Sequence, residues 1–152
     1  MSEEKDLSEL SGVEYLQLVM EREANGETPA ISSFLGMNLV EAEAGRVVVD
    51  LTTSPNFLNT QGTVHAGIIT TLLDTVMGRS IMTMLPGGTP FTTVDLQVHF
   101  IRPVSAYGIR VIGEGKTIRV GRRIATSSGE IRDEDGKLLA FSTCNCLVLK
   151  EN

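Results

Sequence analysis

The sequence lacks the features that mark secreted, membrane-spanning or nucleic-acid-binding proteins. It has no tryptophan and a net charge of −6, and its longest apolar stretch, residues 68–85, is interrupted by Asp74 and Arg79. Such a stretch is too polar for a bilayer span, and the acidic start, MSEEKDLSEL, is unlike a secretory signal. The acidic chain also lacks the basic face that binds a phosphate backbone. We therefore predict a cytoplasmic protein without nucleic-acid or membrane partners.

Cysteine is scarce as well. Cys144 and Cys146 are the only two, and on a strand they point to the same face because they are two residues apart. Beyond this pair, the sequence offers no set of cysteines and histidines with zinc-site spacing. We interpret both as small core residues and predict neither a metal nor another cofactor.

Length and composition fit one folded domain. The chain has 152 residues, of which 41% are hydrophobic and 21% charged, a balance that supports a core and excludes disorder except at the ends. Fifteen glycines beside only five phenylalanines and two tyrosines favour strands and tight turns over a helical bundle. We predict a flexible N-terminus over residues 1–10 and a single domain over residues 11–152.

Hydrophobic periodicity predicts the order of the elements. Ser11 and Glu14 have capping-box spacing and begin an amphipathic helix over residues 11–24. One helical turn over residues 30–36 and a β-hairpin over residues 37–53 should follow. Residues 63–85 are apolar on most sides, which predicts a helix of about six turns surrounded by other elements. Four consecutive strands, a meander, are then expected over residues 91–102, 108–120, 122–133 and 137–149.

The first of these four strands has one apolar and one polar face. An apolar set, Val94, Leu96, Val98 and Phe100, alternates with a polar set, Thr93, Asp95, Gln97 and His99. We expect the apolar set to meet the helix. The element order predicts an α+β fold, an antiparallel sheet curled around one buried helix with an extra N-terminal helix. Its uncovered edges predict association with a second copy.

Asp74 is unusual because it lies in the middle of the helix that should be most buried. A carboxylate there is costly unless it is paired or hydrated. The residues one helical turn away are mostly small or hydroxylated, so a substrate could approach along this strip. The alternative is an aspartate that faces solvent or bonds to nearby backbone.

Residues 59–67, NTQGTVHAG, lead into the same helix through polar and small residues. A helix N-terminus has unpaired N–H groups and a positive dipole end, which can hold a carbonyl oxygen as negative charge develops on it. The alternative is simple capping of the helix by Thr63 or Asn59.

Three segments now indicate a family: NTQGTVHAGIITTLLDTVMG over residues 59–78, FTTVDLQVHFIRP over residues 91–103, and Gly-Arg-Arg at residues 121–123. Together they resemble the hotdog-fold acyl-CoA thioesterases of the phenylacetate-pathway and human thioesterase-superfamily type. The resemblance covers about residues 35–149 and implies a hotdog fold.

The resemblance also implies roles for individual residues. The family's usual His-Gly-Gly appears here as His65-Ala66-Gly67. The backbone N–H of Ala66 would polarise the thioester carbonyl, although its methyl group can crowd the acyl group. Asp74 would act as nucleophile or general base, while Asn59 and His65 orient the substrate. Thr93 would position water or the carboxylate; the alternative is a β-branched residue that only favours the strand.

Further positions are expected to bind substrate. Gly67 and Gly121 belong to the matching segments. Four arginines at strand ends suit the phosphates of coenzyme A, although charged strand ends often only aid solubility: Arg102, Arg119, Arg122 and Arg123.

Distance along the helix predicts the assembly. Ala66 and Asp74 are eight residues apart, about 12 Å along a helix. One helix cannot bring both to the same carbon atom. A two-fold dimer with antiparallel central helices can place Ala66 of one copy opposite Asp74 of the other. We therefore expect a homodimer, or a homotetramer built as a dimer of dimers, with shared sites.

These observations predict hydrolysis of an acyl-CoA thioester to free acid and CoA, with CoA as part of the substrate. One alternative is a non-catalytic acyl-CoA binding module, which the alanine at position 66 keeps open. The other is a hotdog dehydratase, which would need a histidine and a carboxylate acting together.

Overall fold

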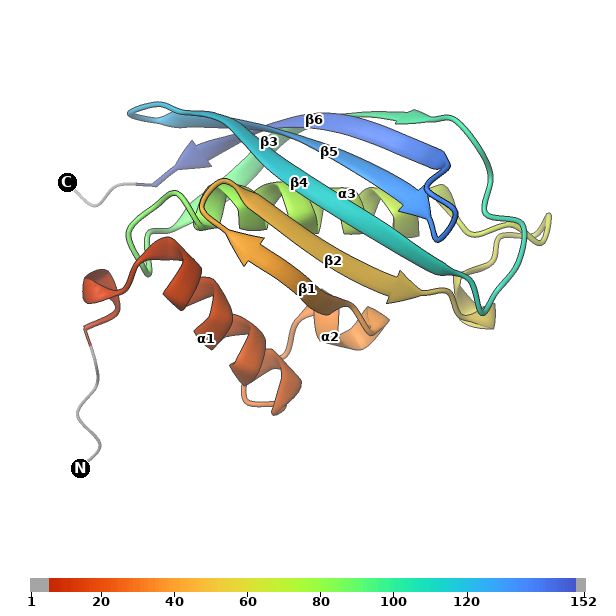
Figure 1. Ribbon diagram of the computed structural model, residues 1–152, viewed down its shortest axis with the longest axis horizontal. Coiled ribbons are helices and arrows are strands. Elements are labelled where there is room, and N and C mark those ends of the chain that lie inside the picture. The colour runs from red at the N-terminus through yellow and green to blue at the C-terminus, as the bar shows by residue number, and fades with distance from the viewer. Residues whose placement is uncertain (1–5, 150–152) are drawn as a thin grey trace.

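The structure, a computed structural model, describes residues 6–149 and consists of one curved sheet around one long helix (Figure 1). In chain order the elements are a 3-10 helix (Leu7–Glu9), α1 (Gly12–Ala24), α2 (Ile31–Leu35), β1 (Asn38–Glu43), β2 (Arg46–Thr52), a second 3-10 helix (Pro55–Phe57), α3 (Ala66–Met82), β3 (Phe91–Phe100), β4 (Arg110–Val120), β5 (Ile124–Asp133) and β6 (Leu138–Val148).

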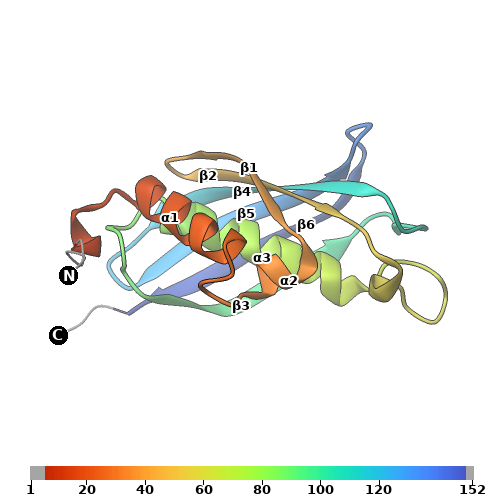
Figure 2. The same ribbon diagram turned by 90° about the horizontal axis from the view of Figure 1, so that it is seen from below.

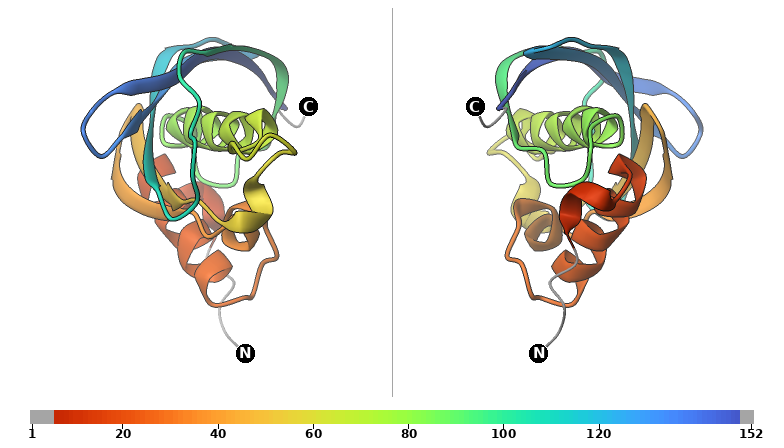
Figure 3. Two further views of the ribbon diagram at one scale, coloured as in Figure 1. Left: turned by 90° about the vertical axis from the view of Figure 1, so that its right-hand side faces the viewer. Right: turned by 90° about the vertical axis from the view of Figure 1, so that its left-hand side faces the viewer.

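All six strands form one antiparallel sheet in the order β1-β2-β4-β5-β6-β3. The sheet arches over α3, which runs along its concave side (Figure 3). Seen from below, α1 and α2 lie on the side of α3 that faces away from the sheet (Figure 2). The predicted α+β architecture, with a wrapped central helix and an extra N-terminal helix, is therefore confirmed.

The core lies between α3 and the concave face of the sheet. Its fully buried side chains come from the helix and from four strands: Leu72, Leu73, Val76, Met77, Val47, Val49, Val111, Ile131, Cys144 and Cys146. The prediction that both cysteines are core residues is confirmed. Gly115 on β4 permits the closest approach, because an added Cβ would lie 2.1 Å from the backbone oxygen of Val76. Helix and sheet thus pack backbone to backbone at this point.

The N-terminal helix begins as its sequence predicts. The backbone N–H of Glu14 donates to the Ser11 hydroxyl at 3.2 Å, and the Ser11 N–H donates to the Glu14 carboxylate at 2.8 Å. A buried ion pair between Glu23 and Arg79, with 3.0 Å between Oε2 and Nη2, then joins α1 to α3. Burial lowers the pKa of Arg79, while Glu23 opposes this shift. Glu23 therefore anchors α1 to the central helix.

The meander prediction is wrong for one strand. β4, β5 and β6 follow one another in the sheet, but β3 pairs with β6 and lies at the edge. The position beside β4 is occupied by β2, and the whole length of β2 pairs with β4. The connection over residues 101–109 carries the chain from the β3 edge across to β4. Sequence periodicity carries no information about such non-local pairing.

The central helix is shorter than predicted, 17 residues over Ala66–Met82 instead of residues 63–85. It begins late because residues 59–65 form a hydrogen-bonded loop whose last residue, His65, caps the helix. It ends at the cap residue Thr83, whose backbone N–H still donates to the Arg79 carbonyl.

The face prediction for β3 is wrong in part. The register with β6 shifts between Thr93 and Asp95, so Val94 is an extra residue at a β-bulge. Thr93 therefore joins Leu96 and Val98 on the helix side, whereas Val94 is 52% exposed. Phe100, also assigned to the buried set, is 51% exposed.

Residues 1–5, half of the predicted flexible N-terminus, lie outside the described residues, and the remainder contains the 3-10 helix Leu7–Glu9 capped by Asp6. Within residues 6–149, no helix is long and apolar enough to cross a membrane. The same residues include no group of three or more histidine, cysteine or acidic side chains that could hold a metal ion.

Candidate active site

Asp74 and Thr93, predicted to act together, are in contact. The Thr93 hydroxyl donates a hydrogen bond to Oδ1 of Asp74 at 2.9 Å. Asp74 projects from α3 and is only partly buried, while Thr93 is turned toward the helix by the bulge at Val94. The neighbouring Thr92 is exposed and belongs to the other face. The carboxylate therefore has a fixed donor on one oxygen and an accessible side.

The N-terminus of α3 is held by His65. Its Nδ1 accepts the backbone N–H of Gly67 at 2.8 Å, and its own backbone N–H donates to the Phe57 carbonyl at 2.7 Å. Because Nδ1 acts as an acceptor, the proton of the neutral ring is on Nε2, which is left to donate to another group. The N–H of Ala66, at the first helical position, has no acceptor within the helix. Within residues 6–149 this N–H donates to no other group, so it can bind an acceptor of a ligand.

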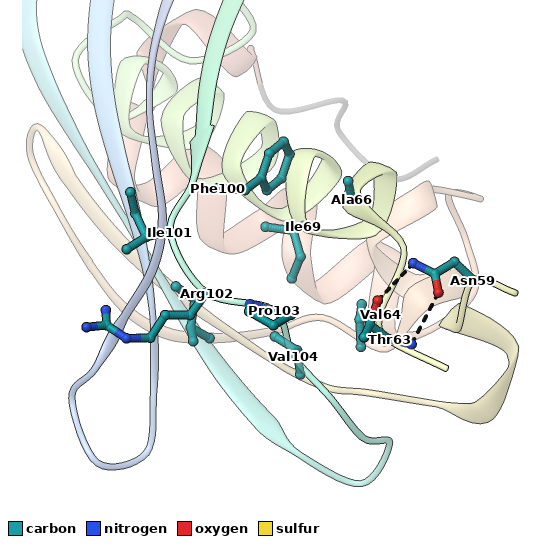
Figure 4. A pocket seen from close by; sticks show the side chains of 11 residues that line it. Asn59, Thr63, Val64, Ala66, Ile69, Phe100, Ile101, Arg102, Pro103 and Val104 are labelled. Atoms are coloured by element: carbon teal, nitrogen blue, oxygen red, sulfur yellow. Dashed lines mark hydrogen bonds between the residues drawn. The ribbon is translucent and has the colours of Figure 1, made fainter. Parts of the chain in front are cut away.

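Asn59 organises the loop before this helix. Its Nδ2 donates to the Thr63 hydroxyl at 2.8 Å, and its Oδ1 accepts the Thr63 backbone N–H at 3.2 Å (Figure 4). The same Oδ1 also accepts the backbone N–H of Gln61 at 2.9 Å. The capping alternative considered for Asn59 and Thr63 therefore takes the form of a loop clamp, with His65 as the actual helix cap. One Nδ2 proton of Asn59 stays available for a ligand.

A cavity of about 310 Å³ opens beside Ala66 (Figure 4). Residues from the loop, α3, the end of β3, the segment after it and β6 line it: Asn59, Thr63, Val64, Ala66, Ile69, Phe100, Ile101, Arg102, Pro103, Val104 and Leu139. The predicted Asn59, Ala66 and Arg102 thus share one hollow. Apart from these residues and Thr63, its lining side chains are apolar, which suits a ligand segment with few charges.

A second hollow, of about 470 Å³, lies at the other side of the same helix end. His65 and Gly67 line it together with apolar side chains from α2 and the Pro55–Phe57 turn: Ile31, Phe34, Leu35, Phe57 and Leu58. Phe34 is 82% exposed, which is unusual for a large apolar side chain. The start of α3 therefore separates two hollows.

The four arginines do not meet within one chain. Arg119, Arg122 and Arg123 lie at or next to the turn between β4 and β5, where Gly121 donates its N–H to the Ile124 carbonyl at 2.8 Å. Arg102 lies near Leu138, whose carbonyl accepts its Nη1 at 2.7 Å. The length of β6, about 30 Å, separates the two ends. In one chain, Ala66 and Asp74 likewise stay apart along α3.

Sequence reasoning placed Cys146 in the core and gave it no part in the site, yet its Sγ lies 3.7 Å from the Thr93 hydroxyl oxygen. The register Thr93↔Cys146 between β3 and β6 places them side by side. The i, i+2 spacing with Cys144 indicated the buried face, but nothing in the sequence indicated which strand would lie opposite.

Comparison with known proteins agrees with this architecture. The family model of the thioesterase superfamily matches residues 61–140. A phenylacetic acid degradation-related protein from Ralstonia eutropha JMP134 is 30% identical, with a TM-score of 0.73 over 85% of this chain and 98% of the other. A variant of the phenylacetic acid degradation protein PaaI from Thermus thermophilus is 27% identical, with a TM-score of 0.71 over 78% and 97%.

Human acyl-coenzyme A thioesterase 13 is 25% identical over 105 residues, which cover 68% of this chain and 74% of the human protein. The match to the family model, residues 61–140, includes the end of the loop before α3, the helix with Asp74 and the strand with Thr93. These similarities agree with the resemblance read from the sequence segments. The chain therefore belongs to the thioesterase superfamily and has its hotdog fold.

Proposed function

We propose that this enzyme hydrolyses an acyl-CoA thioester to a free acid and CoA. The observation that carries the proposal is the hydrogen-bonded Thr93–Asp74 pair on an accessible side of α3, a helix whose N-terminal N–H is unused. A carboxylate that can attack or activate water, and a donor that can stabilise the carbonyl oxygen, are the two groups that thioester hydrolysis needs.

Each residue at the helix end has a task in this proposal. The Ala66 N–H holds the thioester oxygen as charge develops on it, in the field of the helix dipole. Asn59 and His65 orient the thioester through the remaining Nδ2 and Nε2 protons. Asp74 then attacks the carbonyl carbon, which breaks the C–S bond, releases the CoA thiolate and leaves an acyl anhydride that water hydrolyses. Alternatively, Asp74 removes a proton from the water whose attack on this carbon releases the CoA thiolate. No cofactor takes part in the proposed reaction.

The site is completed by a second copy of the chain. β3 is an edge strand with an exposed Val94, so two β3 edges can pair antiparallel about a two-fold axis. Within a chain, Ala66 lies toward the end of β3 and Asp74 toward its start. Antiparallel pairing reverses this order in the second copy, so Ala66 comes opposite the partner's Asp74.

The same two-fold pairing brings arginines from the two copies close together. Arg122 and Arg123 lie beside the start of β3, since the Arg123 carbonyl accepts the N–H of Val148, which pairs with Phe91. Antiparallel β3 pairing therefore moves the partner's Arg122 and the partner's Arg123 toward Arg102. Guanidinium groups at that position suit the phosphates of the CoA nucleotide.

The two hollows bind different parts of the substrate. The hollow that contains Arg102 leads toward the arginines and takes the pantetheine arm. The more aromatic hollow, lined by Phe34, Phe57 and Leu58, takes the acyl group. The thioester then lies over the start of α3, between them.

Thiol release from short, medium, long and aromatic acyl-CoAs tests the proposal. We expect turnover that requires Asp74 and a preference for acyl groups that fill the aromatic hollow. Tight binding of acyl-CoA without thiol release would instead support the binding module, and loss of water from a hydroxyacyl-CoA would support the dehydratase.

A further inference from the structure

Two parallel rows of thiols and hydroxyls lie beneath α3. In the first, Cys146 Sγ is 3.7 Å from the Thr93 hydroxyl, which donates to Asp74 at 2.9 Å. In the second, Cys144 Sγ is 3.1 Å from the Ser127 hydroxyl, which donates to the Met77 carbonyl at 3.2 Å. Both thiols are fully buried and point to the same face of β6. Only the first row ends at a carboxylate.

The single proton of the Thr93 hydroxyl determines which group donates in each hydrogen bond of the first row. An ionised carboxylate only accepts hydrogen bonds, and the Thr93 hydroxyl has a single proton, which therefore points to Asp74. Toward Cys146 the hydroxyl oxygen can then only accept, so the thiol is the donor. We propose that Cys146 is a positioning residue for Asp74, with its S–H donating to Thr93 and the Thr93 O–H donating to the carboxylate.

This row acts on the reaction through Thr93. The Thr93 hydroxyl can rotate about its C–O bond. A Cys146 S–H that donates to the hydroxyl oxygen favours the orientation in which the hydroxyl proton points to Asp74. Successive hydrogen bonds also polarise one another and stabilise the charged end of the row. Since ionised Asp74 is the reactive form in the proposed function, on which this inference rests, Cys146 should raise the rate at acidic pH.

The thiol can act as a donor only while it keeps its proton. The test is therefore made at pH 6, where an ordinary thiol keeps its proton. A serine hydroxyl at position 146 would likewise remain a donor.

The test compares Cys146→Ala and Cys146→Ser with the matched variants Cys144→Ala and Cys144→Ser, which change the same residue type at the same depth. Cys146→Ala should lower kcat at pH 6 about two- to fivefold at unchanged KM, the effect of a weak hydrogen bond. The acid limb of the pH profile should move up by about 0.3–0.5 pH units. Cys146→Ser should restore both quantities.

Cys144→Ala removes as much core volume, so its melting temperature should fall by a similar amount while the acid limb stays in place. Equal pH profiles for the two alanine variants, or a Cys146→Ser variant that behaves as Cys146→Ala, would overturn the proposal.

A carbon NMR titration of the Asp74 carboxyl group gives a readout that does not need turnover. Its midpoint should move to higher pH in Cys146→Ala and stay in place in Cys144→Ala. An unchanged midpoint would refute the positioning role even in an active enzyme. A shifted midpoint in a protein that releases no thiol would instead keep this role and refute the proposed hydrolysis.

Discussion

Replacing Asp74 by asparagine separates a catalytic carboxylate from a structural one. Asparagine has nearly the same shape, and its Oδ1 can still accept the Thr93 hydrogen bond seen at 2.9 Å. It can neither remove a proton from water nor form an acyl anhydride. We expect kcat to fall by about 10²–10⁴-fold, the contribution typical of a positioned acid–base group.

The effect on stability should be small. A hydrogen bond to a charged acceptor contributes about 1.5–3 kcal/mol and one to a neutral acceptor about 1 kcal/mol, so the variant loses part of that interaction. The variant also removes the free-energy cost of a partly buried charged carboxylate, which offsets the loss. The net change should stay within about 1 kcal/mol, a shift in melting temperature of about 2–4 °C for a chain of this size.

The assay measures thiol release and thermal unfolding on one preparation. Asp95→Asn is the matched control, because Asp95 lies two residues from Thr93, on the outer face, where its carboxylate accepts from Asn145 at 2.9 Å. That variant should retain turnover. Near-normal activity of Asp74→Asn together with a large loss of melting temperature would refute the catalytic role.

Three further predictions concern assembly, CoA recognition and packing. Light scattering should show a dimer or tetramer at micromolar concentration, and Val94→Lys at the β3 edge should yield folded, inactive monomers; an active monomer would exclude the shared site. Arg122→Ala and Arg123→Ala should raise KM for a CoA ester several-fold more than for the matching pantetheine ester, and equal effects would place both residues outside the nucleotide site. Gly115→Ala should destabilise the fold by about 1–3 kcal/mol or more, because the added Cβ meets the Val76 carbonyl. Gly78→Ala should instead stabilise α3, because the nearest atom to its added Cβ is a Phe91 side-chain atom at 3.6 Å. Similar unfolding curves for the two variants would contradict the packing argument.

Local chemistry determined much of the fold. The capping box of Ser11 and Glu14 and the β-hairpin after α2 depend on residues close in sequence, and both are observed as predicted. The apolar helix that contains Asp74 is also observed, over a shorter range than predicted. The grouping of Asn59, His65 and Ala66 at one helix end was predictable for the same reason, because all three precede or begin α3 within a few residues.

Tertiary structure decided what depends on partners distant in sequence. Strand order placed β3 beside β6, and that register created the bulge that turns Thr93 toward Asp74 and brings Cys146 behind it. A period of two along β3 could not reveal this, because one inserted residue exchanges the faces of everything on one side of it. The sequence alone therefore determined which residues carry the candidate chemistry, whereas pairing between distant strands decided which of them meet.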